Sequence, residues 1–367
     1  MASLRRAVLA TALAVGTTTG VVPTTAAVER PTQRTYSYVD LGLLPGVNPV
    51  SGRAAARDIN ARGEVVGTTS APDRSAGYGY VFRDGRMISL GSLDTGFFAG
   101  SFGWGINDTG EIVGYTSVTS TEPPHAMVYR NGAMVDLGTG FGSGSFSWAK
   151  EINDTGHIVG VRAASQLGAT RATVWLNGRI IDLPGLGGQD SEANAVNDAG
   201  VVVGKARNSS GSTRAAMWVN NTIQDLGTLG NEIEPSTAED ISDTGAVVGR
   251  STTPNQGTRA FLWRDGIMRD LGSLGGGSSY AQGVNDHDQV VGVVALPGEP
   301  RDNLNRAVLF DNGRVIDLNT RAVNLPSGIT LASAFAINNT GVIVGNSCFN
   351  PCDPFQSVSR AFMLIPR

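Results

Sequence analysis

Ile106-Asn107-Asp108-Thr109-Gly110-Glu111-Ile112-Val113-Gly114 is one of seven copies of the pattern Ile-Asn-x-x-Gly-x-Val-Val-Gly in this 367-residue chain. The copies are 43 to 53 residues apart and begin at Ile59, Ile106, Ile152, Val196, Ile241, Val284 and Ile337. A second anchor, Asp-Leu-Gly or a close variant, begins at Asp40, Ser89, Asp136, Asp182, Asp225, Asp270 and Asp317. A period of this length is typical of solenoids and propellers.

Each unit contains four short apolar runs separated by turn residues. In the fourth unit the runs are 192–196, 201–207, 214–219 and 222–226. Runs of this length predict strands rather than helices, and four successive strands per unit predict an antiparallel propeller blade. The expected fold is therefore all-β, a seven-bladed β-propeller with four-stranded blades.

The spacing between anchors distinguishes two faces of this ring. From the Ile of the first strand to the last Gly of the second, the step is 8 residues in every unit. From the aromatic residue of the third strand to the Asp position of the fourth, it is 7 wherever it can be measured. The other two connections vary in length, and in an up-and-down blade both emerge on the same face. Because variable loops on a rigid scaffold usually carry binding, that face is the candidate working surface.

The two ends of the repeat region complement each other. The chain ends in a third strand at 360–365, whereas 36–41 reads as a fourth strand with no blade before it. We expect the N-terminal strand to complete the seventh blade, which leaves no unpaired edge in the ring. Residues 36–367 are then one propeller domain.

The N-terminus reads as a targeting segment. Arg5 and Arg6 precede an apolar stretch that ends in small residues near Ala27, the pattern of a secretory signal peptide. We expect residues 1–27 to be removed, residues 28–35 to form a short linker, and the mature protein to be extracellular or associated with the cell wall. No transmembrane segment is expected.

Composition limits the partners. Without residues 1–27, 26 basic and 32 acidic residues remain, and this mild acidity argues against nucleic acid. The chain has three histidines in non-equivalent positions, so we predict no metal site and no cofactor. Cys348 and Cys352 lie in one long loop of an exported chain, for which a disulfide is the default. We expect a monomer.

A basic residue on the third strand recurs with the Asp of the fourth. If a two-residue turn joins these strands, the basic residue lies one diagonal step from the Asp. The unit that lacks the basic residue also lacks the Asp, which indicates structural ion pairs rather than an anion site. The predicted pairs are His125 with Asp136, Arg171 with Asp182, Arg214 with Asp225, Arg259 with Asp270, Arg306 with Asp317, and Arg360 with Asp40.

The side chains that differ between units are the candidate ligand-binding residues. The two positions that directly precede each motif Ile carry unlike residues in different units. The position before these two is always Ala or Gly. Repetition in the fold does not explain such variety, so we predict an asymmetric pocket at the channel mouth. The alternative is that its aromatic side chains fill gaps between blades. The candidates are Arg57, Phe98, Phe102, Trp104, Phe146, Trp148, Lys150, Asn194, Glu239, Gln282 and Phe335.

The repeat resembles the HAF-type extracellular repeat. Ala260-Phe261-Leu262-Trp263 and Asp270-Leu271-Gly272-Ser273-Leu274-Gly275-Gly276 carry the resemblance, which covers residues 36–367. Most units have Arg where the family has His before Ala-Phe, with His125 the exception. The resemblance implies a propeller and an extracellular location, and brings no established reaction.

Two functions fit these observations. The favoured one is a secreted, non-catalytic binding or scaffold protein for an extracellular glycan, peptide or envelope component. The alternative is a polysaccharide hydrolase or lyase that uses carboxylates at the channel mouth. Its candidate acids are Asp94, Glu151, Asp190, Glu192, Glu239 and Asp240.

Overall fold

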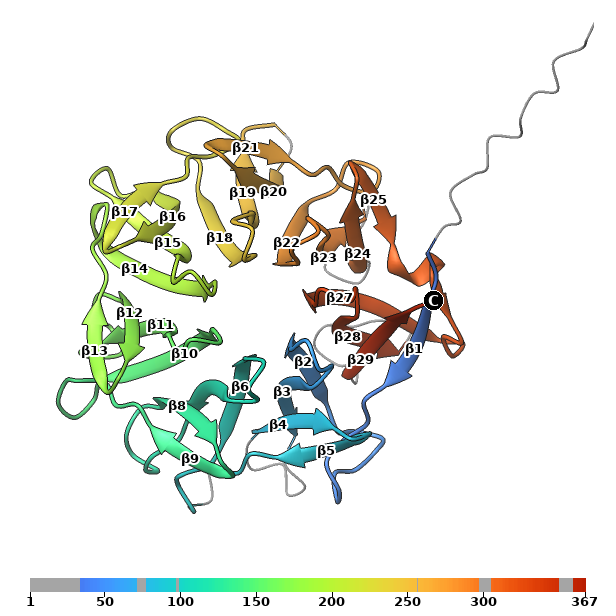
Figure 1. Cartoon of the computed structure of the whole chain (residues 1–367), viewed down its shortest axis with the longest axis horizontal. Coiled ribbons are helices and arrows are strands. Elements are labelled where there is room, and N and C mark those ends of the chain that lie inside the picture. The colour runs from blue at the N-terminus through green and yellow to red at the C-terminus, as the bar shows by residue number, and fades with distance from the viewer. Residues whose placement is uncertain (1–33, 71–76, 97–98, 256, 297–304, 350–358) are drawn as a thin grey trace, which may run out of the picture. The chain divides into compact units, whose positions relative to one another are not determined.

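The structure, a computed structural model, describes residues 34–70, 77–96, 99–255, 257–296, 305–349 and 359–367. Within these residues the strands form seven sheets arranged radially around a common axis (Figure 1), and we call the region along this axis the channel. Six sheets have four strands and follow the chain in order. The predicted seven-bladed β-propeller is confirmed.

The blades are numbered 1 to 7 from the motif at Ile59, and the innermost strand of each lines the channel. From blade 1 to blade 7 these inner strands are β2 (Ala54–Ile59), β6 (Ser101–Ile106), β10 (Phe146–Ile152), β14 (Gly187–Val196), β18 (Ser236–Ile241), β22 (Ser279–Val284) and β27 (Ile329–Ile337). The second strands are β3 (Val65–Ser70), β7 (Ile112–Thr116), β11 (Ile158–Ala163), β15 (Val202–Asn208), β19 (Val247–Thr253), β23 (Val290–Ala295) and β28 (Ile343–Phe349).

The outer half of each blade is a tight hairpin. The third strands are β4 (Gly77–Arg83), β8 (His125–Arg130), β12 (Arg171–Leu176), β16 (Thr213–Val219), β20 (Gly257–Arg264), β24 (Asn305–Asp311) and β29 (Ser359–Pro366). The fourth strands are β5 (Arg86–Ser89), β9 (Ala133–Asp136), β13 (Arg179–Asp182), β17 (Thr222–Asp225), β21 (Ile267–Asp270), β25 (Arg314–Asp317) and β1 (Tyr36–Asp40). The two-residue turn on which the predicted ion pairs depend is present, for example at Asp265-Gly266: both residues have positive φ, and Phe261 pairs with Asp270.

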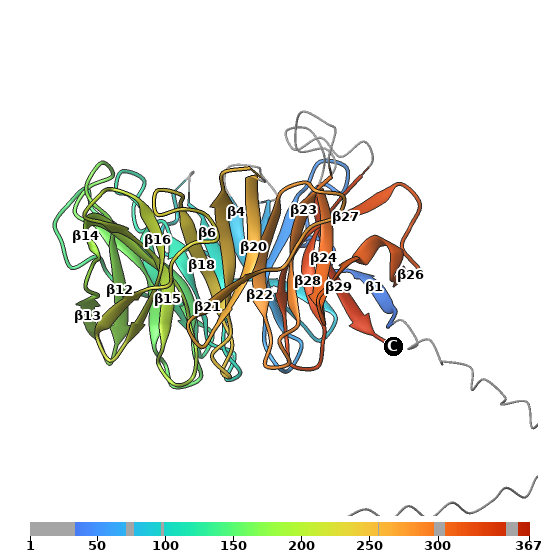
Figure 2. The same cartoon turned by 90° about the horizontal axis from the view of Figure 1, so that it is seen from above.

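The strands run between two faces of the ring (Figure 2). One face, the turn face, carries the two hairpin turns of each blade. The other, the loop face, carries the connections of variable length. The inner strand of each blade begins at the loop face and ends at the turn face, so its first residues lie near the loop-face mouth of the channel.

The last glycine of each Val-Val-Gly motif permits an irregularity in the inner strand. A Cβ atom on these glycines would lie 1.8–2.1 Å from a backbone carbonyl of the neighbouring inner strand. Every inner strand has a register shift at this level, for example between Ala149 and Glu151 in β10. The glycine therefore makes space for a β-bulge, and the residue inside the bulge leaves the hydrogen-bonded ladder.

Blade 7 closes the ring as predicted, with one addition. Strand β1 pairs antiparallel with β29, from Tyr36 opposite Pro366 to Asp40 opposite Phe362. Beyond β1 lies β26 (Ala322–Val323), a short parallel strand that the sequence did not predict. The long connection after β25 forms a 3₁₀ turn, η1 (Leu318–Thr320), and the Tyr36 N–H donates to the carbonyl of Arg321 at 2.9 Å.

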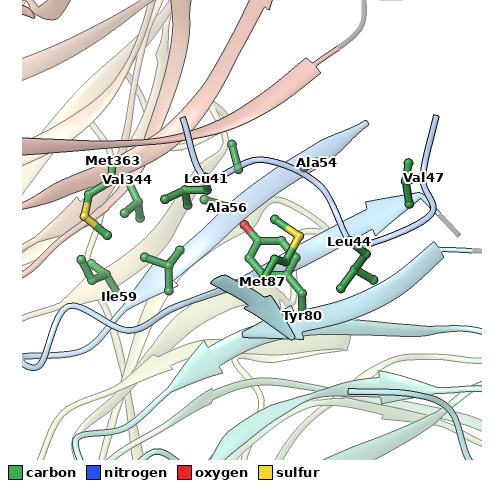
Figure 3. Packing of buried hydrophobic residues seen from close by; sticks show 12 residues of the cluster. Leu41, Leu44, Val47, Ala54, Ala56, Ile59, Tyr80, Met87, Val344 and Met363 are labelled. Carbon is green, nitrogen blue, oxygen red and sulfur yellow. The ribbon is translucent and has the colours of Figure 1, made fainter. Parts of the chain in front are cut away.

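The core lies between adjacent blades rather than inside any one. The cluster in Figure 3 joins Val344 and Met363 of blade 7 to Ala56, Ile59 and Tyr80 of blade 1. Similar clusters occur at the other blade contacts, because each blade is apolar on both sheet surfaces. The bulky residues of the repeat are thus shared between neighbours.

The Asn of the Ile-Asn motif links each blade to the next. Its Nδ2 donates to the backbone carbonyl at the same position in the following blade, as from Asn107 to Asn153 at 3.2 Å and from Asn153 to Asn197 at 2.8 Å. Asn338 of blade 7 donates to Asn60 of blade 1 at 3.1 Å, across the junction where the ring closes. Ser242 occupies this position in blade 5. The Asn Oδ1 also accepts from N–H groups of its own turn, so these segments form tight hydrogen-bonded turns.

Replacing Asn338 by alanine is expected to lower the free energy of unfolding by about 1–3 kcal/mol, because it removes the hydrogen bond to the Asn60 carbonyl across the junction and leaves the Val342 N–H without its Oδ1 acceptor. Chemical denaturation would measure the loss. Asn339→Ala, an exposed neighbour, is the control and should cost much less. Equal losses in the two variants would contradict a stabilising role for the hydrogen bond between Asn338 and Asn60.

Candidate functional site

The seven bulges place one residue of each blade at the channel, outside the strand ladder. These residues are Arg57, Trp104, Lys150, Asn194, Glu239, Gln282 and Phe335. Several contact the neighbouring blade: the Arg57 guanidinium lies 4.9 Å from the Phe335 ring centre, and Lys150 Nζ lies 6.0 Å from that of Trp104. The predicted variable positions therefore form a connected, asymmetric set around the mouth.

Aromatic rings of blades 2 and 3 gather on one side of this mouth. Phe102 stacks on Tyr115 with ring centres 4.6 Å apart, and Trp104 meets the edge of Tyr115 at 5.3 Å and of Trp148 at 6.2 Å. All four side chains are half-buried. We call Phe102, Trp104, Tyr115 and Trp148 the aromatic platform.

Some of the predicted aromatic residues line the mouth, and others fill space between side chains. Phe146 is buried and packs against Trp148 with ring centres 4.9 Å apart, so it supports the platform from beneath. Phe98 lies outside the described residues. Tyr115 was missed by the sequence analysis because it follows the motif glycine on the second strand, where no comparison between units drew attention to it.

The other side of the mouth is polar and paired. Lys150 Nζ lies 2.8 Å from both Glu192 and Asn194, and Lys205 lies 3.1 Å from Glu192. Burial alone would raise the pKa of Glu192, but the two lysines lower it overall. Glu239 lies 2.5 Å from Arg250, yet burial raises the pKa of Glu239. Gln282 is half-buried on β22.

Three further carboxylates lie deeper in the channel and bind backbone N–H groups. Asp58 accepts from Ile59 at 2.7 Å and, across the blade contact, from Ile106 at 2.8 Å. Asp240 does the same with Ile241 and Val284, both at 2.8 Å, and Glu151 accepts from Ile152 at 2.9 Å. Asp58 and Asp240 therefore join neighbouring blades, whereas Glu151 accepts within its own strand. We call Asp58, Glu151 and Asp240 the channel carboxylates.

Burial shifts the titration of this group. It raises the pKa of Asp58 to about 6 and that of Asp240 to about 7, although the amide hydrogen bonds partly oppose the shift. Burial and the charge of Asp58 raise the pKa of Glu151 well above its ordinary value. All three line a cavity of about 220 Å³ that reaches the turn face, where a ring of aspartates surrounds it.

The remaining acids predicted for catalysis are engaged elsewhere. Asp190 pairs with Arg207 at 3.4 Å and accepts from the Thr170 N–H at 3.2 Å. Asp94 accepts from the Gly96 N–H at 2.9 Å in its loop. Among the described residues, no group of three or more His, Cys, Asp or Glu side chains is placed to hold a metal ion.

The structure places five of the predicted structural pairs within ion-pair distance. The separations are 3.0 Å for His125 and Asp136, 3.0 Å for Arg171 and Asp182, 3.5 Å for Arg214 and Asp225, 3.9 Å for Arg259 and Asp270, and 4.0 Å for Arg306 and Asp317. In blade 3, Arg162 joins the pair at 2.7 Å from Asp182. Burial would raise the pKa of Asp182, but hydrogen bonds from the two arginines lower it.

The sixth predicted pair is wrong. Within the described residues Arg360 forms no ion pair with Asp40 and instead donates to the backbone carbonyls of Pro49 and Gly52. Asp40 accepts from the Gly42 N–H at 2.8 Å. The loop between β1 and β2 offers its carbonyls to the buried guanidinium, much as Arg214 donates to the Glu234 carbonyl at 2.6 Å. These arginines therefore also hold loops of the loop face in place.

Cys348 is disulfide-bonded. The other cysteine of the chain, Cys352, lies outside the described residues, as does most of the loop that contains it. Of the helices in the described part of the chain, none has the length and apolar character to cross a bilayer.

Comparison with known proteins identifies the fold and no family. Neither a family model nor a curated protein matches the chain. Among solved structures it is similar to a puromycin-hydrolyzing peptidase of Mycobacterium tuberculosis, with 12% identity over 86% of this chain and 52% of that one, at a TM-score of 0.54. A puromycin hydrolase mutant complexed with PGG has 13% identity over 83% and 53%, with a TM-score of 0.54.

A lectin of Aleuria aurantia in complex with Fucα1-6GlcNAc is also similar, with 12% identity over 76% of this chain and 98% of that one, at a TM-score of 0.41. The chain spans about half the length of the peptidase and of the puromycin hydrolase. At these identities the similarity extends to the arrangement of strands alone. The chain is thus a β-propeller, and these comparisons assign no role to its mouth residues.

Proposed function

We propose that this protein is a secreted, non-catalytic binding module that recognises an extracellular glycan at the loop-face mouth of its channel. The aromatic platform carries the proposal. Half-buried, mutually stacked rings beside hydrogen-bonding side chains suit the apolar faces and hydroxyl groups of sugars. Secretion rests on the N-terminal sequence, and we infer from the recurring motifs that the repeat is of HAF type.

The platform is also preorganised for binding. Each ring is held by at least one other ring, and the bulge that presents Trp104 is fixed by the glycine on β7. Lys150 and Asn194 are positioned by Glu192 and the carbonyl of Ala238. Little side-chain freedom remains to be lost when a ligand binds, which favours affinity.

A peptide or an envelope component remains an alternative ligand. The proposed hydrolase or lyase has weaker support, because mouth acids such as Glu192 and Glu239 pair with cations and the channel carboxylates accept backbone N–H groups. A catalytic acid needs a free oxygen aimed at substrate. The solved structures similar to this one include both peptidases and a lectin, and therefore favour neither function.

Replacing Trp104 by alanine is expected to weaken glycan binding at least about tenfold, because it removes a ring that contacts both Tyr115 and Trp148. A glycan array would identify the ligand, and titration calorimetry would compare the variants. Ile267→Ala removes an exposed apolar side chain on β21 and is the control. Thermal midpoints would show that both variants are folded. Unchanged affinity in a folded Trp104→Ala protein would contradict the proposal.

A further inference from the structure

A separate pocket lies beside the aromatic platform and is lined mainly by blade 1, with Phe102 of blade 2 and Ser359 of blade 7. Its volume is about 300 Å³, and its polar lining consists of two arginines and four hydroxyl side chains: Arg53, Arg57, Thr68, Thr69, Ser70 and Ser359. Neither Asp nor Glu is among the described residues that line it. The described lining therefore offers the Arg57 guanidinium and several hydroxyl groups as hydrogen-bond donors.

Arg57 differs from the other charged residues of the mouth. Lys150 and Glu239 each lie against an opposite charge, whereas Arg57 forms no ion pair within the described parts of the chain and has the Phe335 ring beside it. Its side chain remains accessible to solvent, yet partial burial in the mouth lowers the pKa of Arg57. A guanidinium in this setting gains from an incoming anion, since a carboxylate can accept two parallel hydrogen bonds from it.

Thr69 supplies an independent indication of a ligand. Only 2% of this residue is exposed, and its Oγ1 atom has no hydrogen-bond partner among the described residues. A buried hydroxyl without a partner is unfavourable, so the site is incomplete in the free protein. Thr69 is one of the residues that line the pocket, so a bound ligand would lie next to this unsatisfied hydroxyl.

Phe102 connects the pocket to the platform. It lines the pocket, and its ring also stacks on Tyr115 of the platform. A sugar chain that lies on the platform would therefore reach the pocket with an adjacent residue. The hydroxyl groups of Thr68, Thr69 and Ser70 suit sugar oxygens, and Arg57 suits a carboxylate.

We propose that this pocket binds the carboxylate of an acidic sugar residue, which makes the ligand of the mouth an acidic glycan. The proposal rests on the proposed function and adds the chemical class of the ligand. The protein carries a net charge of −4 and would on average repel such a ligand. A preference for the acid must therefore arise locally, from this pocket.

The test compares trigalacturonate with its fully methyl-esterified form, which has the same sugar rings without the charges. The full-length chain should bind the acid at least about tenfold more tightly than the ester in titration calorimetry. Arg57→Gln is expected to bring the two affinities within about twofold of each other, mainly by weakening acid binding. Thr69→Val, which keeps the shape and removes only the unpartnered hydroxyl, should weaken acid binding about threefold or more. Arg179→Gln, an exposed arginine on β13, is the control.

The outcomes separate this proposal from the proposed function. Equal affinity of the wild-type protein for acid and ester, with both lost in Trp104→Ala, overturns the acidic ligand and leaves glycan binding intact. An acid preference lost in Arg57→Gln and unaffected by Trp104→Ala supports the pocket and contradicts the platform. Binding of neither compound overturns the pocket as assigned. Inorganic phosphate that competes better than galacturonate would show a general anion site and overturn the assignment to a sugar carboxylate.

Discussion

Replacing Gly160 by alanine is expected to destabilise the protein by at least about 3 kcal/mol and to disrupt the aromatic platform. The added Cβ would lie 2.0 Å from the carbonyl oxygen of Trp148 and 3.0 Å from the Cα of Ala149. Both are backbone atoms, so the strand rather than a side chain must move. That strand carries Trp148 and, within its bulge, Lys150.

A second glycine of the same blade provides the control for this result. Gly178 has φ +74 in the hairpin turn and nothing within 4 Å of the added Cβ. Gly178→Ala should therefore cost only the strain of a left-handed residue, about 1–2 kcal/mol. Urea denaturation measures both losses, and binding assays on folded Gly160→Ala protein should show weakened affinity. Equal destabilisation of the two variants would show that β11 does not need close contact with β10.

The second large effect concerns pH. The raised pKa of Asp240, about 7, means that the folded chain retains a proton that the unfolded chain has already lost. This retention disfavours the folded state increasingly as the pH rises from about 4 to about 7. Asp240→Asn removes the titration, so its stability relative to wild type should improve by about 2–4 kcal/mol between pH 4 and pH 8.

The sign of this effect changes along the titration. At pH 4 the asparagine variant should be the less stable one, because its amide replaces an acceptor for the Ile241 or Val284 N–H. By pH 8 the buried charge of the wild type outweighs that loss. Denaturation at several pH values measures the difference, and Asp270→Asn, an exposed acid on the outer edge of blade 5, should show no comparable change. A difference between wild type and Asp240→Asn that stays constant with pH would contradict the assignment.

The sequence predicts the parts of this fold that depend on local turns. Asp265-Gly266 needs positive φ at both positions, and this requirement alone sets the register of Phe261 against Asp270. The incomplete units at the two ends likewise predict the pairing of β1 with β29, because an open ring would leave an edge unpaired. Such inferences need only periodicity and chain connectivity.

The sequence could identify the residues of the candidate site that differ between units, but it could not predict which of them contact one another. The glycine of each Val-Val-Gly motif was visible in the sequence, but its close approach to a carbonyl becomes evident only when the strands are paired. Tyr115 contacts Trp148 of the next blade, and Asp58 lies near enough to Glu151 to raise its pKa, so both belong to contacts between blades. Arg360 donates to backbone carbonyls of a long loop instead of pairing with Asp40. Every residue has a backbone carbonyl, so the sequence does not show which ones accept from an arginine.

The bulges have a consequence for how this molecule can vary. At each bulge the ladder bypasses one residue, whose side chain then takes no part in pairing the strands. Arg, Trp, Lys, Asn, Glu, Gln and Phe all occupy this place within a single chain, on one and the same backbone. The repeat thus separates residues that pair the strands from residues that can differ without altering the pairing. Side chains around one opening can therefore change by substitution, subject to their contacts with one another, without any change in the length of the chain or the number of its blades.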